Sequence, residues 1–365
     1  MASFDEVLKD CTKLGTKIPT SEYLENGKYP IIDQGQNDIA GYHDSDDGLF
    51  EDVPTIVFGD HTRVVKYVDK PCFLGADGVK LLCPVDKDIN CKYLFYQLSY
   101  ADIPNTGYNR HFKWVKALNF KIPSSDEQNH VVEVLDKVTE LISLRKQQLA
   151  RLDELVKARF VEMFGDLVVG DKIQTSKKKI GEIASVTKLA GFEFTKYIQY
   201  KEHGDIIMLR GLNCKQGKLI LDDVKWIDRE TSDLLPRSKL YYGDILMTYA
   251  GTIGDVAMVD ENDKYHLAPN VAKVSINNKK AYNPIFLMYL FLYSNDYIMR
   301  FASQVAQASI NMEKIRNFEY YFPDVTFQNQ FATFVARVDQ QKQTVQQSLE
   351  KLELMKKALM QEYFG

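Results

Sequence analysis

The residues best suited to recognising another molecule form a polar segment, Asn105 to Trp114, in which amide, guanidinium and aromatic side chains surround a glycine. Asparagine pairs with adenine through two hydrogen bonds, arginine pairs with guanine in the same way, and lysine holds phosphates. No acidic residue occurs from Ile103 to Ser125, so this region is locally basic although the chain carries a net charge of −4. We expect the segment to bind a nucleic acid. The alternative is an ordinary polar loop that caps a helix.

A second segment, Ser303 to Asn311, is also rich in amides and free of acids. The strand-turn regions around Thr62 and Tyr249 add further polar candidates. The full set of residues expected to contact DNA is Thr62, Arg63, Asn105, Tyr108, Asn109, Arg110, His111, Lys113, Lys116, Arg210, Asn213, Tyr249, Thr252, Gln304, Gln307, Ser309 and Asn311.

The motifs that could support catalysis have simpler structural explanations. Gly251–Gly254 lacks the Gly-Lys-Ser/Thr of a phosphate loop, which favours a tight turn between two strands. Asn283–Phe286 resembles the Asn-Pro-Pro-aromatic element of amino-methyltransferases but lacks its second proline, and Pro284 fits the first turn of a helix. Gly59–His61 fits a turn, and the six histidines lack zinc-site spacing. No catalytic residue, cofactor site or metal site is therefore predicted on this chain.

Composition indicates a globular protein of two domains. The chain has 365 residues, 45% of them hydrophobic and 26% charged, and it exceeds the usual size of a single core. Five cysteines without a CxxC pair indicate reduced thiols, and Met1–Lys17 mixes acids and lysines with apolar residues, unlike a signal peptide. The most apolar run, Ile285–Tyr293, is far shorter than the ~20 residues that span a bilayer. We expect a cytoplasmic protein with no membrane partner.

A long-range repeat predicts how these parts are arranged. Pro123–Gly165 recurs without a gap as Pro323–Gly365, and the matches include Gln128 with Gln328 and Phe164 with Phe364. Both copies lack Gly and Pro inside, which favours a long helix in each. Apolar residues recur in each copy at alternating steps of three and four, a pattern typical of helices that pair. The residues expected in this seam are Leu135, Val138, Ile142, Leu149, Leu152, Val156, Val338, Val345, Leu349, Leu352 and Leu359.

Cations in the seam indicate the direction of pairing. Arg145 and Arg159 interrupt one line of seam positions in the first helix, whereas Lys342 and Lys356 interrupt the other line in the second. Antiparallel pairing within one molecule places each cation against an aliphatic residue, with Arg145 facing Leu349 and Lys342 facing Leu152. Parallel association of identical chains would instead stack like charges. We therefore expect an antiparallel coiled coil.

Before each helix lies a strand-rich region with matching landmarks, so each unit should be α+β. Runs of Val, Ile, Tyr and Phe punctuated by Gly and Asp read as short strands. The matched segments are residues 27–32 with 204–209, 55–61 with 244–251, 73–82 with 266–275, and the apolar helices 93–100 with 285–293. Elsewhere the units diverge, as expected if each recognises something different.

This arrangement resembles the specificity subunit of type I DNA restriction-modification systems. The resemblance covers the whole chain and rests on Leu246–Gly254, the polar segments before Phe120–Pro123 and Tyr320–Pro323, and the two Phe-Gly helix ends. The first unit departs from it, with Gly59-Asp60-His61-Thr62 where the second has Gly251–Gly254.

The resemblance implies target recognition domains at residues 1–122 and 166–321 and spacer helices at 123–165 and 322–365. It implies that the chain reads a bipartite double-stranded DNA sequence, docks two methyltransferase subunits through its helices and joins restriction subunits. S-adenosylmethionine would then bind to the methyltransferase subunits, with no cofactor on this chain. The competing hypothesis is a non-catalytic helical scaffold with two β-rich protein- or carbohydrate-binding domains. A chain with its own methyltransferase or nuclease activity is disfavoured by the missing motifs.

Overall fold

The computed structural model places the chain in two compact units. Unit 1 comprises Met1–Gln148 and Val345–Gly365, and unit 2 comprises Leu149–Thr344. The structure describes residues 1–75, 78–173, 175–303 and 308–365. Each unit therefore contains half of each long helix, whereas the sequence repeat predicted the helices as segments of their own.

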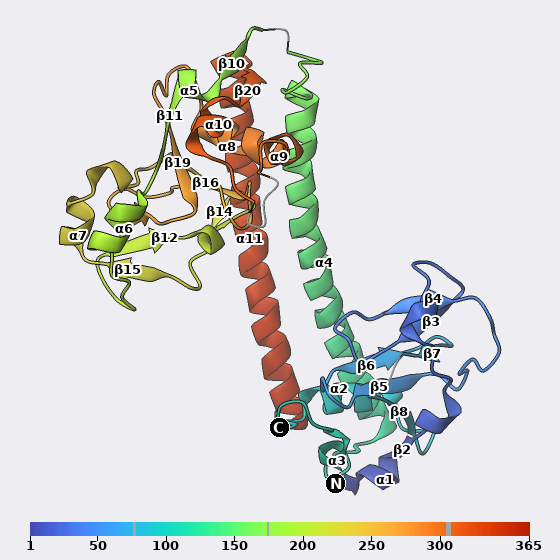
Figure 1. Ribbon diagram of the computed structural model, residues 1–365. Helices are drawn as coiled ribbons and strands as arrows, with labels where there is room; N and C mark the ends of the chain where they lie inside the picture. Colours follow the sequence, from blue (N-terminus) through green and yellow to red (C-terminus); the bar gives the residue numbers. More distant parts are fainter. Residues whose placement is uncertain (76–77, 174, 304–307) are drawn as a thin grey trace. The chain divides into compact units, whose positions relative to one another are not determined.

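Unit 1 contains two small sheets and a strand pair (Figure 1). The first sheet is antiparallel, in the order β2 (Leu8–Asp10), β8 (Val79–Pro84), β5 (Thr55–Gly59) and β6 (Val65–Val68). The second has the order β4 (Gly41–His43), β3 (Tyr29–Ile32) and β7 (Phe73–Leu74), and its β3–β7 pair is parallel. Strands β1 (Ala2–Ser3) and β9 (Asn119–Phe120) pair separately.

Unit 2 repeats this topology. Its four-stranded antiparallel sheet has the order β11 (Ala184–Lys188), β19 (Val271–Ile276), β16 (Ile245–Thr248) and β17 (Val256–Met258). The second sheet is β15 (Lys225–Ile227), β12 (Ile206–Leu209) and β18 (Tyr265–Leu267), again with one parallel pair, and β10 (Lys177–Lys179) pairs with β20 (Glu319–Tyr321). The hairpin of β13 (Cys214–Lys215) and β14 (Lys218–Leu219) has no counterpart among the described residues of unit 1. The predicted α+β repeat is confirmed.

Short helices connect the strands. In unit 1 they are α1 (Phe4–Val7), α2 (Cys91–Tyr100) and α3 (Phe112–Val115). In unit 2 they are α5 (Ile180–Ile183), α6 (Gly191–Tyr197), α7 (Arg229–Asp233), α8 (Pro284–Tyr293), α9 (Asn295–Met299) and α10 (Met312–Arg316). Pro284 occupies the first turn of α8, as predicted.

An amide cluster at the start of each long helix explains part of the sequence repeat. In unit 1 the amide N–H of Asn90, which caps α2, donates to Gln128 Oε1 at 2.9 Å, and Gln128 Nε2 donates to the Pro123 carbonyl at 2.9 Å. In unit 2, Asn283 donates to Gln328 Oε1 at 2.9 Å, and Gln328 donates to the Pro323 carbonyl at 2.8 Å. The repeated Pro and Gln residues thus attach each long helix to its unit.

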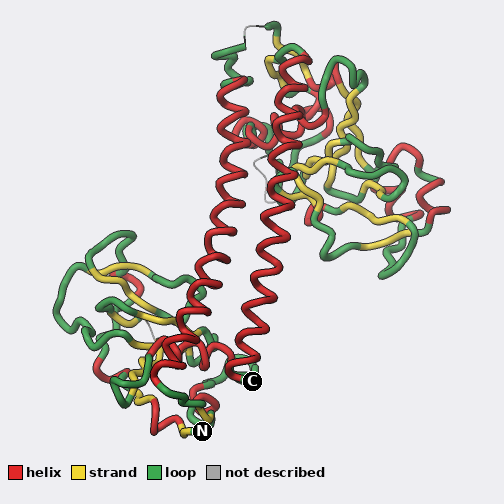
Figure 2. Tube along the Cα trace, turned by 180° about the vertical axis from the view of Figure 1, so that it is seen from behind, coloured by secondary structure: helices red, strands yellow, loops and turns green. Residues whose placement is uncertain are grey.

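The long helices are α4 (Ser125–Phe164) and α11 (Val325–Phe364), which run antiparallel within each unit (Figures 1 and 2). In unit 1, Arg145 Nε donates to Ser348 Oγ at 3.2 Å. In unit 2, Lys342 forms an ion pair with Asp153. Each cation thus reaches the residue beside its expected partner. Every seam residue named above is buried or half-buried.

Each long helix contributes its two ends to different cores. Helix α4 begins in the core of unit 1 with Val131 and Leu135, and its last residue, Phe164, is fully buried in the core of unit 2. Helix α11 begins in unit 2 with Phe331 and ends in unit 1 with Phe364. Phe164 packs against Phe286 and Phe331, whereas Phe364 packs against Tyr93 and Tyr100. The matched Phe-Gly ends therefore complete two separate cores.

Candidate nucleic-acid interface

In unit 1, Asp60 joins the turn after β5 to the polar segment before α3. The amide of His111 donates to the Asp60 carbonyl at 2.8 Å, and the amide of Phe112 donates to the Asp60 carboxylate at 2.7 Å. Asp60 is only 3% exposed, so its carboxylate caps α3 from inside the protein. The predicted turn at Gly59–His61 is confirmed, and its acid has a structural role.

The side chain of His111 lies inside the same structure. It is fully buried, with Nδ1 2.9 Å from the Asp60 carbonyl and Nε2 3.3 Å from Thr106 Oγ1. A buried ring held at both nitrogens cannot reach a base. We therefore assign His111 to holding the loop, in place of the predicted contact with DNA.

Other side chains of the loop point outward. Tyr108 is 88% exposed, and its ring stacks on His61 with centroids 4.7 Å apart and planes at 7°. Asn105, Arg110, Lys113 and Lys116 are also exposed. The Lys113 ammonium lies 5.1 Å from the Trp114 ring, and that of Lys116 lies 5.5 Å from the Phe112 ring. Aromatic and cationic groups thus share one exposed surface.

The remaining unit 1 candidates are partly used within the protein. Asn109 is exposed, but its side-chain amide donates to the Thr106 carbonyl. Thr62 Oγ1 donates to the Gln34 carbonyl at 2.7 Å, and Arg63 Nη1 donates to the Ile103 carbonyl at 3.0 Å. Arg63 therefore ties the β5–β6 turn to the start of the polar loop.

In unit 2, backbone pairing joins the β16–β17 turn to the second polar segment. The Ile310 amide donates to the Tyr249 carbonyl at 2.8 Å, and Ala250 pairs with Ser309 as an antiparallel bridge. Asn311 Oδ1 caps α10 by accepting from the Lys314 amide at 2.8 Å. Thr252 is exposed in the turn, which is the predicted one between two strands. Gln304 and Gln307 lie outside the described residues.

Two further candidates, Arg210 and Asn213, hold the loop after β12. Asn213 is fully buried, and its Nδ2 donates to the Ile220 carbonyl at 2.7 Å and to the Asp223 carbonyl at 2.9 Å. We assign it to loop structure, in place of the predicted contact with DNA. Arg210 Nη2 donates to the Asp223 carboxylate at 2.8 Å. This ion pair fixes one edge of the guanidinium.

A hollow of about 450 Å³ opens beside Thr252. Arg210, Phe194 and Tyr200 line it together with Asn270, which is not among the residues predicted to contact DNA. Asn270 lies in the left-handed region with φ 68°, and its carbonyl accepts from the amide that follows β16, as the carbonyl of Gly78, with φ 91°, accepts from the amide that follows β5. No sequence signal singled out Asn270, because the matched segments 73–82 and 266–275 place Gly78 opposite Val271.

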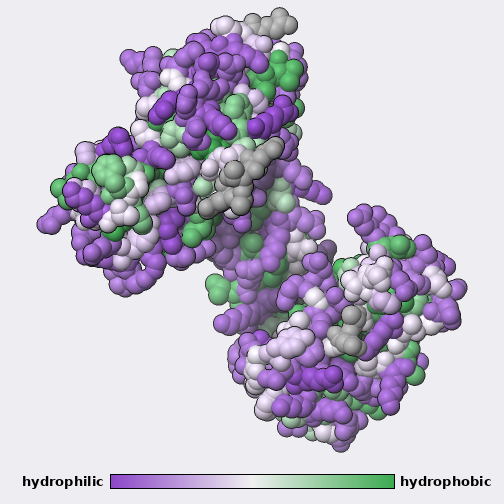
Figure 3. Space-filling model, viewed as in Figure 1, coloured by the Kyte–Doolittle hydropathy of each residue, from purple (hydrophilic) through white to green (hydrophobic). Residues whose placement is uncertain are grey.

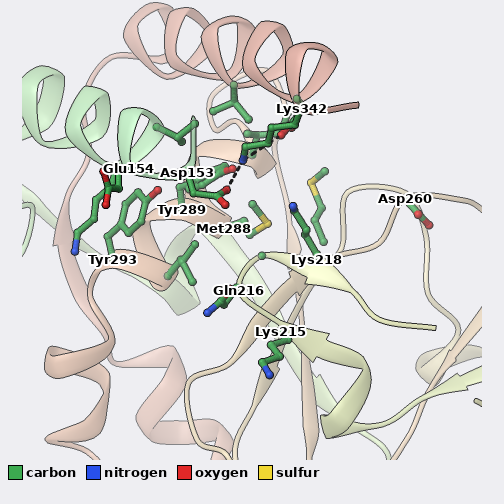
Figure 4. Close-up of a pocket in the computed structure, with 18 of the residues that line it drawn as sticks. Asp153, Glu154, Lys215, Gln216, Lys218, Asp260, Met288, Tyr289, Tyr293 and Lys342 are labelled. Carbon is green, nitrogen blue, oxygen red and sulfur yellow. Dashed lines mark hydrogen bonds and ion pairs between the residues drawn. The ribbon is translucent and has the colours of Figure 1, made fainter. Parts of the chain in front are cut away.

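A larger cavity of about 650 Å³ lies between the β13–β14 hairpin, α8 and the unit 2 halves of the long helices (Figure 4). Its apolar lining includes Met288 and Leu292, and its charged groups include the Lys342–Asp153 pair. Burial raises the pKa of the Tyr289 and Tyr293 hydroxyls. Neutral phenols and apolar side chains suit packing better than acid–base chemistry at neutral pH.

The structure also shows the surroundings of the residues that could bind a metal ion, of the cysteines and of the most apolar helices. Among the described residues no group of three or more His, Cys, Asp or Glu residues could hold a metal ion. The cysteines are free and buried, and burial raises the pKa of Cys72, Cys91 and Cys214 to about 12. Over the same residues, no helix is long and apolar enough to cross a membrane.

Apolar residues are exposed on the unit 1 halves of the long helices. Leu141 and Leu144 of α4 are 43% and 50% exposed, and Leu354 and Met355 of α11 are 68% and 47% exposed. Apolar patches are visible along the helix pair in Figure 3. Gln341 and Thr344 stand two hundred positions after the two leucines, whereas Leu155, two hundred positions before Met355, is 47% exposed, so the apolar surface is repeated only in part in unit 2.

Comparison with known proteins identifies relatives along the whole chain. The family model of the type I restriction modification DNA specificity domain matches residues 5–154 and 174–354. The type I restriction enzyme EcoBI specificity subunit of Escherichia coli is 26% identical over 244 residues, which are 60% of this chain and 50% of that subunit, so the match spans about half of the relative. The putative MjaX specificity subunit of Methanocaldococcus jannaschii is 23% identical over 393 residues, covering 95% of this chain and 86% of the relative.

Two solved structures share the fold. The S subunit of a type I restriction-modification system from M. genitalium aligns with a TM-score of 0.58 at 17% identity, over 100% of this chain and 95% of that one. A chain from a study of complex assembly and conformational transition of the type I R-M system aligns with a TM-score of 0.57 at 13% identity, over 98% and 94%. Since the family model covers most of the sequence, this chain belongs to the family of type I restriction-modification specificity subunits.

Proposed function

We propose that this chain is the non-catalytic subunit that reads a bipartite DNA sequence for a type I restriction-modification complex in the cytoplasm. Residues 1–122 and 166–321 are the two target recognition domains, and each reads one half of the site. The observation that carries the proposal is the pair of units with one topology and different loops at the equivalent edge. Two domains with the same sheet topology and divergent loops are suited to reading two different sequences.

The long helices fit the spacing that such reading requires. Two domains that bind one face of a duplex contact half-sites whose centres are about one helical turn apart, ~34 Å. A helix of 40 residues, as in α4 and α11, is ~60 Å long. The helices can therefore link the two domains without contacting bases, and the base pairs between the half-sites go unread.

Methyltransferase subunits dock on the helix pair in this proposal. The exposed Leu141 and Leu144, with Leu354 and Met355 on the partner helix, provide apolar area that a second protein can bury. Two methyltransferase subunits carry S-adenosylmethionine and the chemistry, and restriction subunits join the complex. A chain of the same fold comes from a study of complex assembly of the type I R-M system, in keeping with a chain that assembles with other subunits.

Exchange of one domain tests separable reading. Residues 1–122 are replaced by the equivalent domain of a relative, and methylated sites are mapped by sequencing in cells that carry the methyltransferase subunits. We expect one half of the methylated sequence to change while the other half and the spacer length persist. Exchange of residues 166–321 is the matched control and should change the other half. A change in both halves from either exchange would refute modular reading.

A second experiment tests docking. The double variant Leu141→Gln, Leu144→Thr gives α4 the residues found two hundred positions later, Gln341 and Thr344. The tagged chain is then used to capture methyltransferase subunits from the native cell. We expect fewer captured subunits per chain than with the wild type. The control Gln341→Ala, Thr344→Ala changes the equivalent polar positions and should capture the normal number. Failure of the wild type to capture any methyltransferase would favour the helical scaffold.

A further inference from the structure

The hollow beside Thr252 in unit 2 has two chemically different walls. Phe194, Tyr200, Leu212 and Pro269 form an apolar wall, and the rings of Phe194 and Tyr200 lie 5.6 Å apart. Asn270 and Thr252 contribute neutral polar side chains to the same hollow, and Arg210, which is paired with Asp223, contributes a cation. Both neutral polar residues are exposed, as are Tyr200 and Leu212. The hollow is therefore open to a ligand that has a hydrogen-bonding edge beside an apolar group.

Asn270 provides the hydrogen-bonding group. Its backbone carbonyl accepts from the Tyr249 amide at 3.0 Å, which fixes the residue at the edge of the β16–β17 turn. Its side-chain amide makes no hydrogen bond to any residue of the described ranges. Its φ of 68° is one that glycine adopts freely and that asparagine tolerates better than most other residues. The backbone is thus held by the protein, while the amide is left for another molecule.

Unit 1 shows that the fold itself does not require this side chain. Its equivalent, Gly78, also supplies a carbonyl, which accepts from the Asp60 amide at 2.7 Å. A Cβ on Gly78 would lie 2.6 Å from Gln34 Nε2 and 2.7 Å from His61 Cδ2, so the space is already filled. In unit 2 the corresponding space is the hollow. The shared topology therefore does not explain why unit 2 has an amide side chain at this position.

We propose that the hollow of unit 2 reads an A·T base pair through the major groove, with the Asn270 amide paired to the edge of adenine. Asparagine bonds adenine at N6 and N7, and apolar side chains contact the thymine methyl group. An A·T pair presents both features side by side, as the two walls require. This inference rests on the proposed DNA reading and specifies one residue and one base pair of the second half-site.

The test uses the full chain in complex with its methyltransferase subunits and a library of randomised duplex DNA. Asn270→Gly keeps the left-handed backbone without strain and removes the amide. At one position of the second half-site, its preference for adenine should fall roughly 5- to 150-fold, as expected for a lost bidentate contact. Asn270→Asp should move the preference at that position toward cytosine, whose N4 donates to a carboxylate. Replacing thymine by uracil opposite that adenine should weaken binding by the wild type.

Gln216→Gly is the matched control. Gln216 also has a positive φ, 50°, and carries a primary amide, but it lies in the β13–β14 hairpin outside this hollow. Its base preferences should equal those of the wild type. The inference is overturned if the Asn270→Gly complex keeps every base preference of the wild type, or if the variant binds all sequences equally more weakly. A wild-type complex that selects no sequence would instead refute the proposed function itself.

Discussion

Units 1 and 2 share a frame, and in both a backbone amide of the exposed loop donates to the residue after the first hairpin strand, Asp60 after β5 or Tyr249 after β16, but the further attachments of the two loops differ. In unit 1, one buried carboxylate, Asp60, attaches the polar loop to the β5–β6 turn and caps α3. In unit 2 the further attachment is made by backbone pairing at Ala250 and Ser309, and Asn311 caps α10. Loops held by different bonds can diverge while the sheets beneath stay the same. This difference shows how one topology can carry two unlike surfaces.

The two cores differ in how fully they enclose the helix ends. Phe164 is fully buried in unit 2, whereas Phe364 is 8% exposed in unit 1. We expect Phe164→Ala to lower the free energy of unfolding of unit 2 by ~3–5 kcal/mol, the usual cost of such a truncation in a core. Phe364→Ala should cost unit 1 less. Urea denaturation followed by hydrogen exchange in each unit measures both, and a larger loss from Phe364→Ala would reverse the comparison.

The two helix caps should also differ in strength. Asp60→Ala removes the buried carboxylate that caps α3 by accepting from the Phe112 amide, so we expect a loss of about 2 kcal/mol, at the upper end for caps. Asn311→Ala removes an exposed cap and should cost about 1 kcal/mol. Thermal denaturation gives the totals, and hydrogen exchange at residues 112–115 and 312–316 locates them. Equal losses would mean that burial adds nothing to the Asp60 cap.

A buried histidine gives unit 2 a dependence on pH. Burial lowers the pKa of His266, although the carbonyls of Leu267 and Leu235 at 3.2 and 3.3 Å act in the opposite direction. Since the unfolded chain then binds the proton more tightly, stability is full above the ordinary histidine pKa of ~6.5 and falls as the pH drops below it.

His266→Gln should flatten this decline, as measured by urea denaturation between pH 5 and 8. His203→Gln changes an exposed histidine and is the control. An unchanged slope in His266→Gln would assign the acid sensitivity to other groups.

The smallest expected effect concerns phosphate contacts in unit 1. If the exposed Lys113 and Lys116 hold phosphates, each alanine variant should weaken binding to all sequences alike. The slope of log affinity against log salt should flatten by about 0.9 for each lost contact. Arg110→Ala should instead relax discrimination at one base pair of the first half-site. Titration of cognate and scrambled duplexes across salt concentrations separates these outcomes, and a Lys113→Ala effect confined to one sequence would contradict the assignment.

The sequence predicted the frame better than the surface. The repeat predicted the long helices and most strands, because apolar periodicity and Gly/Pro punctuation act locally. His111 and Asn213 were selected for their polar side chains, yet both are fully buried. Composition cannot tell which side chain of a polar loop turns inward, since that depends on carbonyls distant in sequence, such as that of Asp60. Asn270 was missed because Pro269-Asn270 reads as an ordinary turn.

The return of α11 to unit 1 has a consequence for how the protein is made. Residues 1–148 leave the ribosome early, but the segment that contributes Met360 and Phe364 to their core is made only after all of unit 2. Domains of a growing chain generally fold in order from the N-terminus. Here the first unit made is the last to close. Until then Tyr93 and Tyr100 lack their aromatic partner, so nascent chains should be substrates for chaperones for as long as translation of the second unit lasts.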